Sequence, residues 1–173
     1  SLPAVQGTSN PLCVALHPDD SLLATGGADS NIKLIRWGEA LAPGESSSVK
    51  AVDESITIPC GAPVICCSFA QIGQGKRLSV VAGGCMDGSV KLAYGDQLVD
   101  QEDVGRILKS DNDIKHEKYV KSICWSPSES IVATASADGT IQLTRVGYVD
   151  RENSTVSLEV LKTIHFDKAG KCV

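Results

Sequence analysis

The chain has 173 residues, a formal net charge of −5 and a hydrophobic share of 42%, values normal for one globular domain. It contains no run of lysines and arginines, so we expect no nucleic-acid partner. No apolar run approaches the roughly 18–20 residues that span a bilayer, and no signal peptide is visible, so we expect no membrane association.

The first predicted elements are four short β-strands. LCVALHP (12–18) ends at a proline, whose missing N–H stops a strand ladder. LLATGGADSNIKL (22–34) contains two more strands, joined by a tight turn at Asp29. A long polar loop, Gly38–Glu54, then leads to a fourth run, Ser55–Pro59. This stretch therefore predicts one four-stranded antiparallel unit.

The same plan occurs twice more along the chain. The turn aspartates Asp29, Asp87 and Asp138 lie 58 and 51 residues apart, and the middle copy carries an insertion at Gly73–Arg77. Loops at Gly95–Asp103 and Gly147–Thr155 are expected to precede the fourth strands of these copies. The predicted strands of the two later copies are VICCSFA (64–70), VVAGGCMDGSVKL (80–92), VGRILK (104–109), VKSICWSP (120–127), IVATASADGTIQL (131–143) and VSLEVLKTI (156–164).

Sheets of four antiparallel strands that repeat every 50 to 60 residues indicate an all-β protein built by stacking sheets around an axis. About three such blades are present. We expect them at about residues 11–59, 64–109 and 116–164, with the start of a fourth at 165–173, where His165 would repeat His116. Because three blades do not close a ring, we expect a segment of a longer propeller. The alternative is a short chain that completes itself by self-association.

The third copy, HEKYVKSICWSPSESIVATASADGTIQL (116–143), resembles a repeat of the WD-repeat β-propeller family. In that family a His, a Ser or Thr, the turn Asp and a Trp form a hydrogen-bonded set that stabilises each blade. The resemblance assigns this structural role to His116, Thr134, Asp138, Thr25, Asp29 and Asp87. The Trp is replaced by Ile35, Ala93 and Thr144 in the three copies, so we expect apolar packing instead of the polar set in the first two.

Cysteine and histidine usage gives no sign of a metal site. Cys13, Cys66, Cys67 and Cys124 lie in predicted strands, which favours buried, reduced side chains, and no C-x-x-C pair is present. Cys66 and Cys67 are adjacent and should point to opposite faces of their strand. His17, next to Pro18, is expected at the surface.

The residues point to binding rather than catalysis, with no cofactor and no metal. Each turn Asp is expected to accept hydrogen bonds within its own turn. The family resemblance implies a non-catalytic scaffold that holds protein partners, inside the cell in cytoplasm or nucleus. The alternative is a propeller-based hydrolase with a site at the central channel. The loops before the first strands and the Asp turns should lie on one face, so the candidate partner-binding residues are Tyr119, Lys118, Asn31 and Met86.

Overall fold

The computed structural model describes residues 10–18, 22–36, 56–72, 78–95, 105–126, 129–150 and 152–166. These ranges contain β-strands in three antiparallel sheets, and within them no helix is long and apolar enough to cross a membrane. Blade 1 comprises β1 (Pro11–Leu16), β2 (Leu22–Gly27), β3 (Asn31–Arg36) and β4 (Ile56–Pro59). Blade 2 comprises β5 (Val64–Ile72), β6 (Leu78–Cys85) and β7 (Val90–Tyr94). Blade 3 comprises β8 (Val120–Trp125), β9 (Ile131–Ser136), β10 (Thr140–Asp150) and β11 (Thr155–His165).

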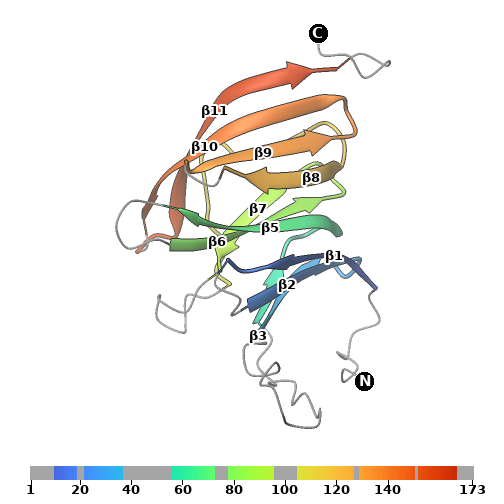
Figure 1. Ribbon diagram of the computed structural model, residues 1–173, viewed down its shortest axis with the longest axis vertical. Coiled ribbons are helices and arrows are strands. Elements are labelled where there is room, and N and C mark those ends of the chain that lie inside the picture. The colour runs from blue at the N-terminus through green and yellow to red at the C-terminus, as the bar shows by residue number, and fades with distance from the viewer. Residues whose placement is uncertain are drawn as a thin grey trace.

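Within each sheet the strands follow one another in chain order. The three sheets lie side by side, with blade 2 between the other two (Figure 1). The first strands are neighbours, because β5 contacts both β1 and β8. The prediction of an all-β fold built from propeller-like blades is therefore confirmed. The predicted insertion at Gly73–Arg77 and the loop Gly38–Glu54 lie outside the described residues.

The fourth run of blade 2 differs from the prediction. The described part of Val104–Lys109 forms isolated bridges rather than a continuous strand, with Ile107 opposite Ala93. At Lys109 the backbone turns from β7 to blade 3. The Lys109 amide donates to the Ser154 carbonyl at 2.9 Å, and the Lys109 carbonyl accepts from the Val156 amide at 2.8 Å. This segment divides its hydrogen bonds between two blades, which prevents a regular ladder with β7.

The loop predicted at Gly147–Thr155 is also different in the structure. β10 continues to Asp150 and β11 begins at Thr155, so most of the expected loop is a long hairpin. Burial explains the extension, because Val146 and Val156 are 2% and 5% exposed and pack in the same core as Leu108 of blade 2. An isolated loop would leave these two side chains in water.

The described residues form two hydrophobic core clusters, one in each seam between blades. Cys67 Sγ approaches the Ala24 carbonyl of blade 1 at 3.9 Å, whereas Cys66 Sγ approaches the Val120 carbonyl of blade 3 at 3.4 Å. The prediction that adjacent cysteines face opposite sides is confirmed. The seam between blades 1 and 2 includes Leu22, Ala24, Ile32, Leu34, Ile58, Val64, Phe69, Val81 and Ala93, and the seam between blades 2 and 3 includes Val80, Ala82, Leu92, Tyr94, Leu108, Val120, Ile123, Val132, Val146 and Val156.

Two sequence predictions about burial were wrong. His17 is 1% exposed: its Nε2 lies 2.6 Å from Ser79 Oγ, and its ring packs edge-on against Phe69 at 5.2 Å. Blade 2 covers the end of β1 and supplies these partners. Cys124 is exposed, because it lies on the face of blade 3 that points away from blade 2.

Candidate functional site

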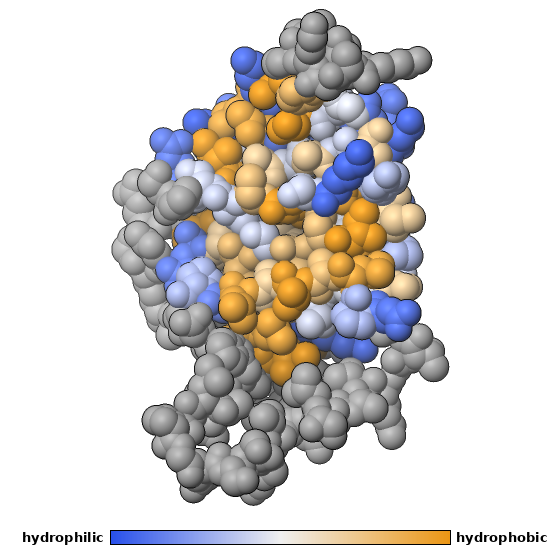
Figure 2. Space-filling model, turned by 45° about the vertical axis from the view of Figure 1, so that its right-hand side comes forward, coloured by the Kyte–Doolittle hydropathy of each residue, from blue (hydrophilic) through white to orange (hydrophobic). Residues whose placement is uncertain are grey.

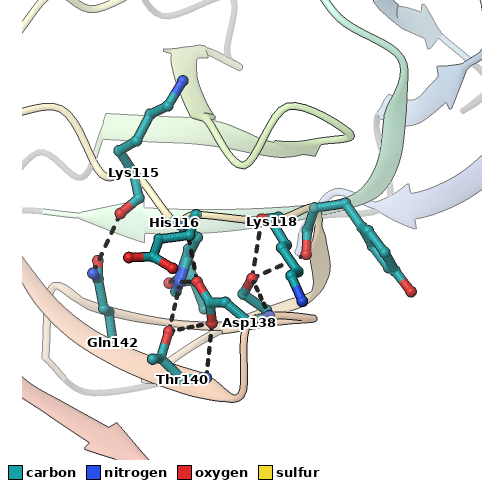
Figure 3. Close-up of polar contacts among 10 residues, drawn as sticks. Lys115, His116, Lys118, Asp138, Thr140 and Gln142 are labelled. Atoms are coloured by element: carbon teal, nitrogen blue, oxygen red, sulfur yellow. Dashed lines mark hydrogen bonds and ion pairs between the residues drawn. The ribbon is translucent and has the colours of Figure 1, made fainter.

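A buried histidine organises the loop that leads into blade 3 (Figure 3). His116 Nε2 lies 2.8 Å from Thr134 Oγ1 on β9, and Nδ1 lies 2.9 Å from Thr140 Oγ1 at the start of β10. Asp138 completes the group: its Oδ1 accepts hydrogen bonds from the Thr140 hydroxyl and amide, and its Oδ2 accepts from the Glu117 amide at 2.9 Å. The structure therefore brings His116, Thr134 and Asp138 into one network.

The direction of these hydrogen bonds fixes the tautomer of His116. The Thr140 hydroxyl donates to Asp138, so it accepts from His116, and Nδ1 carries the proton. Nε2 then accepts from the Thr134 hydroxyl. Burial lowers the pKa of His116, and the negative charge of Asp138 only partly opposes this. Burial acts to raise the pKa of Asp138, but the bonds from Thr140 and Glu117 outweigh it and lower that pKa to about 2.

Sequence reasoning missed Thr140 and Ser136, which support this network. The hydroxyl of Ser136 donates to the carbonyls of Lys118 and Tyr119, at 3.0 and 3.1 Å, and so holds the backbone of the loop. A signal for Thr140 was present in the sequence. A hydroxyl residue stands two places after the turn aspartate in blade 2 as well, where Ser89 donates to Asp87 at 2.6 Å.

Each tight turn also bonds the segment that leads into the next blade. Carbonyls of Ser30, Gly88 and Gly139 accept from the amides of Cys60, His116 and Phe166, at 2.8, 2.9 and 2.8 Å. Phe166 therefore occupies the place of His116, which corrects the assignment of His165. Instead, His165 pairs with Thr140 and ends β11.

The described residues of blades 1 and 2 form no counterpart of the His116 network, and apolar groups take its place in blade 2. A Cβ at Gly83 would lie 2.5 Å from Ile32 Cδ1, so an isoleucine side chain fills the space beside the glycine. Ala93 is 1% exposed and packs with Ile107. The turn aspartate of blade 1, Asp29, accepts from the Asn31 amide and forms an ion pair with Lys33 at 3.1 Å. Thr25 of β2 is half-buried.

In blade 3 the substitution at the expected Trp position leaves a polar atom without a partner. Thr144 is completely buried, and among the described residues its hydroxyl has no hydrogen-bond partner. A threonine side chain is shorter than tryptophan and does not reach Thr134, which bonds His116 instead. The network in this blade is therefore a His–Thr–Asp–Thr group rather than one that includes Trp.

The candidate partner-binding residues are exposed to different degrees. Met86 is 50% exposed and Tyr119 is 39% exposed, with the Lys121 ammonium 6.0 Å from the tyrosine ring centre. The side chain of Lys118 is exposed while its carbonyl is held by Ser136. Asn31 is different, because its side-chain amide donates to the Asp29 carbonyl within its own turn at 3.0 Å.

These exposed side chains share one end of the blades. The Met86 amide donates to the Pro63 carbonyl, and the equivalent Ala137 amide donates to the Tyr119 carbonyl, at 2.9 and 3.0 Å. A Cβ at Gly88 would lie 2.2 Å from the His116 carbonyl oxygen, so the turn of blade 2 lies directly against the loop of blade 3. We call residues 86–88 and 115–119 the turn-loop surface.

The described residues show no arrangement typical of hydrolytic or metal chemistry. No group of three or more His, Cys, Asp or Glu side chains converges among them. A pocket of about 290 Å³ lies beside β7, and its lining contains one carboxylate, Asp113, together with Lys91 and Lys109. Glycoside hydrolysis uses a pair of carboxylates, and the lining of this pocket contains only one.

Comparison with known families identifies the repeat. Residues 3–36 and 110–144 match the family model described as WD domain, G-beta repeat. The first range includes β1–β3, and the second includes the His116 loop, β8, β9 and the start of β10. With three blade-like sheets in place, these matches support a WD-repeat family for the chain, and the repeats of that family generally mediate protein–protein interactions. A search of curated proteins found no match to the chain.

Proposed function

We propose that this chain is a non-catalytic interaction scaffold that presents its turn-loop surface to a protein partner within a larger complex, inside the cell. One observation carries the proposal. The backbone of the 115–119 loop is held by Asp138, Ser136 and Gly88, while the side chains of Lys118 and Tyr119 point outward. A rigid backbone with exposed side chains binds with little loss of conformational entropy.

The chemistry of the surface favours a protein partner. Tyr119 provides an aromatic anchor beside Lys121, and Met86 provides an adaptable apolar contact on the neighbouring turn. The turn aspartates, which the hydrolase alternative requires as reacting groups, are occupied by hydrogen bonds in their own turns. No observation on the described residues favours that alternative.

The test is a pull-down with the intact protein from cells, followed by affinity measurement with each partner identified. Tyr119→Ala and Met86→Ala are expected to weaken the binding of a partner at this surface at least tenfold. Tyr148→Ala is the matched control, because Tyr148 is 77% exposed but lies on β10, outside the turn-loop surface. Unchanged affinity in both Tyr119→Ala and Met86→Ala, with every partner tested, would refute the proposal.

A further inference from the structure

β11 is the edge strand of blade 3, and blade 2 contacts the start of its outer edge (Figure 1). The inner edge of β11 pairs with β10 from Thr155 to His165. On the outer edge, a parallel bridge joins Thr155 to Lys109. The Lys109 amide donates to the Ser154 carbonyl, and the Val156 amide donates to the Lys109 carbonyl, at 2.9 and 2.8 Å. Blade 2 therefore begins a parallel ladder along this edge.

Among the described residues, this ladder ends after its first bridge. Beyond Lys109 the chain returns to blade 2, where Lys115 pairs with Ser89. Because the peptide groups of alternate residues point to opposite edges of a strand, those of Leu158 and Val160 point outward, as that of Val156 does. No backbone group in the part of the chain that the structure describes pairs with Leu158 or Val160 on that side. The edge thus presents unpaired N–H and C=O groups where the chain's own ladder ends.

An apolar pocket lies beside this open edge. Its volume is about 290 Å³, and Leu158 lines it together with Leu92 and Leu108 of blade 2, which are 3% and 5% exposed. Val160 follows Leu158 on the same face of β11, because the register shows no bulge in β11 between them, and it is 52% exposed. A strand added along the edge therefore places alternate side chains against an apolar surface.

The charges around the pocket favour an acidic strand. The lining contains two lysines, Lys91 and Lys109, and one carboxylate, Asp113. The acidic residue of β11, Glu159, is already paired with Arg145 at 2.7 Å. Positive charge is therefore in excess at the pocket, although the whole chain has a net charge of −5.

We propose that the open edge of β11 is a second interaction surface, which binds an extended, acidic segment of a partner protein as an added strand. The segment continues the parallel ladder that Lys109 begins and exchanges backbone hydrogen bonds with Leu158 and Val160. One of its apolar side chains enters the pocket. Backbone bonds supply affinity in this mode of binding, and the pocket selects the side chain. The surface lies on other elements than the turn-loop surface and does not depend on it.

The experiment measures the binding of a fluorescein-labelled peptide to the full chain by fluorescence anisotropy. The peptide alternates valine with threonine and carries an aspartate at each end. We expect saturable binding, together with slower hydrogen exchange in β11 when the peptide is bound. A peptide with lysine in place of both aspartates should bind at least tenfold more weakly. If the aspartate peptide does not bind, the proposal is wrong.

Methylated peptides test whether binding occurs through backbone pairing. Methyl groups on the valine amides block one edge of the peptide, and methyl groups on the threonine amides block the other. Because the apolar pocket and the parallel direction fix which edge faces β11, one of these peptides should bind and the other should not. Equal binding of the two would refute strand addition.

Matched substitutions locate the site on the protein. Val160→Asp should weaken binding at least tenfold, whereas Val14→Asp, at a valine that is 63% exposed on blade 1, should leave it unchanged. Tyr119→Ala should also leave it unchanged, so this surface and the turn-loop surface can fail separately. The methylated peptides use the unaltered protein, so a folding defect in Val160→Asp does not remove the test. If the amides of β11 become protected as protein concentration rises without peptide, a second copy covers the edge and the proposal is overturned.

Discussion

His116 contacts two hydroxyl groups and lies 3.5 Å from a carboxylate oxygen, while only 4% of its surface is exposed. Removing its ring leaves the Thr134 hydroxyl buried without a partner, which costs roughly 1–3 kcal/mol in addition to the lost bonds. We expect His116→Ala to lower the free energy of unfolding by about 3 kcal/mol in urea denaturation. His165→Ala is the control, because His165 is exposed on the end of β11, and it should change the value by less than about 0.5 kcal/mol.

The same histidine predicts a pH dependence of stability. Burial lowers its pKa in the folded state, so below about pH 6.5 the unfolded chain binds a proton that the folded chain does not. The free energy of unfolding should therefore fall as the pH drops from 7 to 5. Thermal melts between pH 7 and pH 5 measure this dependence. In His116→Ala the stability should change less steeply with pH. An equal slope in both proteins would contradict the assignment of a neutral, buried imidazole.

Asp138 acts in a lower pH window. Its folded-state pKa of about 2 lies below the ordinary value, so its stabilising effect is complete above about pH 4 and is lost as the pH falls towards 2. Asp138→Asn should reduce stability at pH 7. It should also weaken the fall in stability with decreasing pH between about pH 4 and pH 2. Acid titration followed by circular dichroism measures this. Asp111→Asn is a control, because Asp111 is an exposed carboxylate outside this network, and it should leave the stability at pH 7 and in acid unchanged.

Gly88 and Gly139 share a left-handed backbone, with φ of 84° and 88°, but differ in their surroundings. Blade 1 has Ser30 at the same place with φ of 64°, so this turn tolerates a side chain at a cost of roughly 1–2 kcal/mol. A Cβ on Gly88 would also collide with the His116 carbonyl, whereas on Gly139 its nearest neighbour is 3.3 Å away. We expect Gly88→Ala to destabilise by well over about 2 kcal/mol and Gly139→Ala by about 1–2 kcal/mol. Similar losses in chemical denaturation of the two variants would contradict this.

Among the elements, the extended β10–β11 hairpin has a testable role in joining blades 2 and 3. Val156 is buried against the segment that follows β7, whereas Val160 on the same strand is 52% exposed. Val156→Ala should lower the free energy of unfolding by about 2 kcal/mol, since it leaves a cavity in the seam. Val160→Ala should have little effect. Hydrogen exchange should also speed up at Leu108, whose amide bonds the Leu92 carbonyl, in the first variant only.

In the whole molecule, equivalent side chains of the three blades can be compared for burial. Leu34 and Leu92 occupy equivalent positions and are 1% and 3% exposed, but Leu143 of blade 3 is only half-buried. Val14 of blade 1 is 63% exposed, while its counterpart Ile123 is 8% exposed. Figure 2 shows apolar side chains in orange gathered low on the coloured surface, level with blade 1 in Figure 1. On the outer faces of blades 1 and 3, apolar side chains therefore stand at positions that a neighbouring blade covers in the internal seams.

These faces predict self-association when the chain is produced by itself. Light scattering after size-exclusion chromatography should show mass rising with concentration. Val14→Lys combined with Leu16→Lys should reduce this association, because it places two charges on the blade 1 face. Tyr148→Lys, on the exposed β10, should leave it unchanged. A monomer at all concentrations would contradict the prediction. So would association of the Val14→Lys, Leu16→Lys double variant that equals that of the unmodified chain.

The strand order and the turns were predictable from the sequence because they depend on local signals. Proline ends a strand, and Asp-Gly specifies a tight turn at Asp87 and Asp138, wherever the neighbouring blades lie. The alternation of side chains predicted that Cys66 and Cys67 face opposite ways, since a strand has a period of two. The structural role of His116, Thr134 and Asp138 came from the family resemblance, not from this alternation.

Only the tertiary structure decided what happens between blades. Nothing local shows that Ser79 and Phe69 would cover His17, or that Val146 and Val156 would extend a hairpin across blade 2. These contacts join residues far apart in the chain, and their energy comes from burial against a neighbouring sheet. The sequence of a single segment determines its strands and turns, because their hydrogen bonds are local. The burial of a side chain depends instead on which neighbouring surface packs against it.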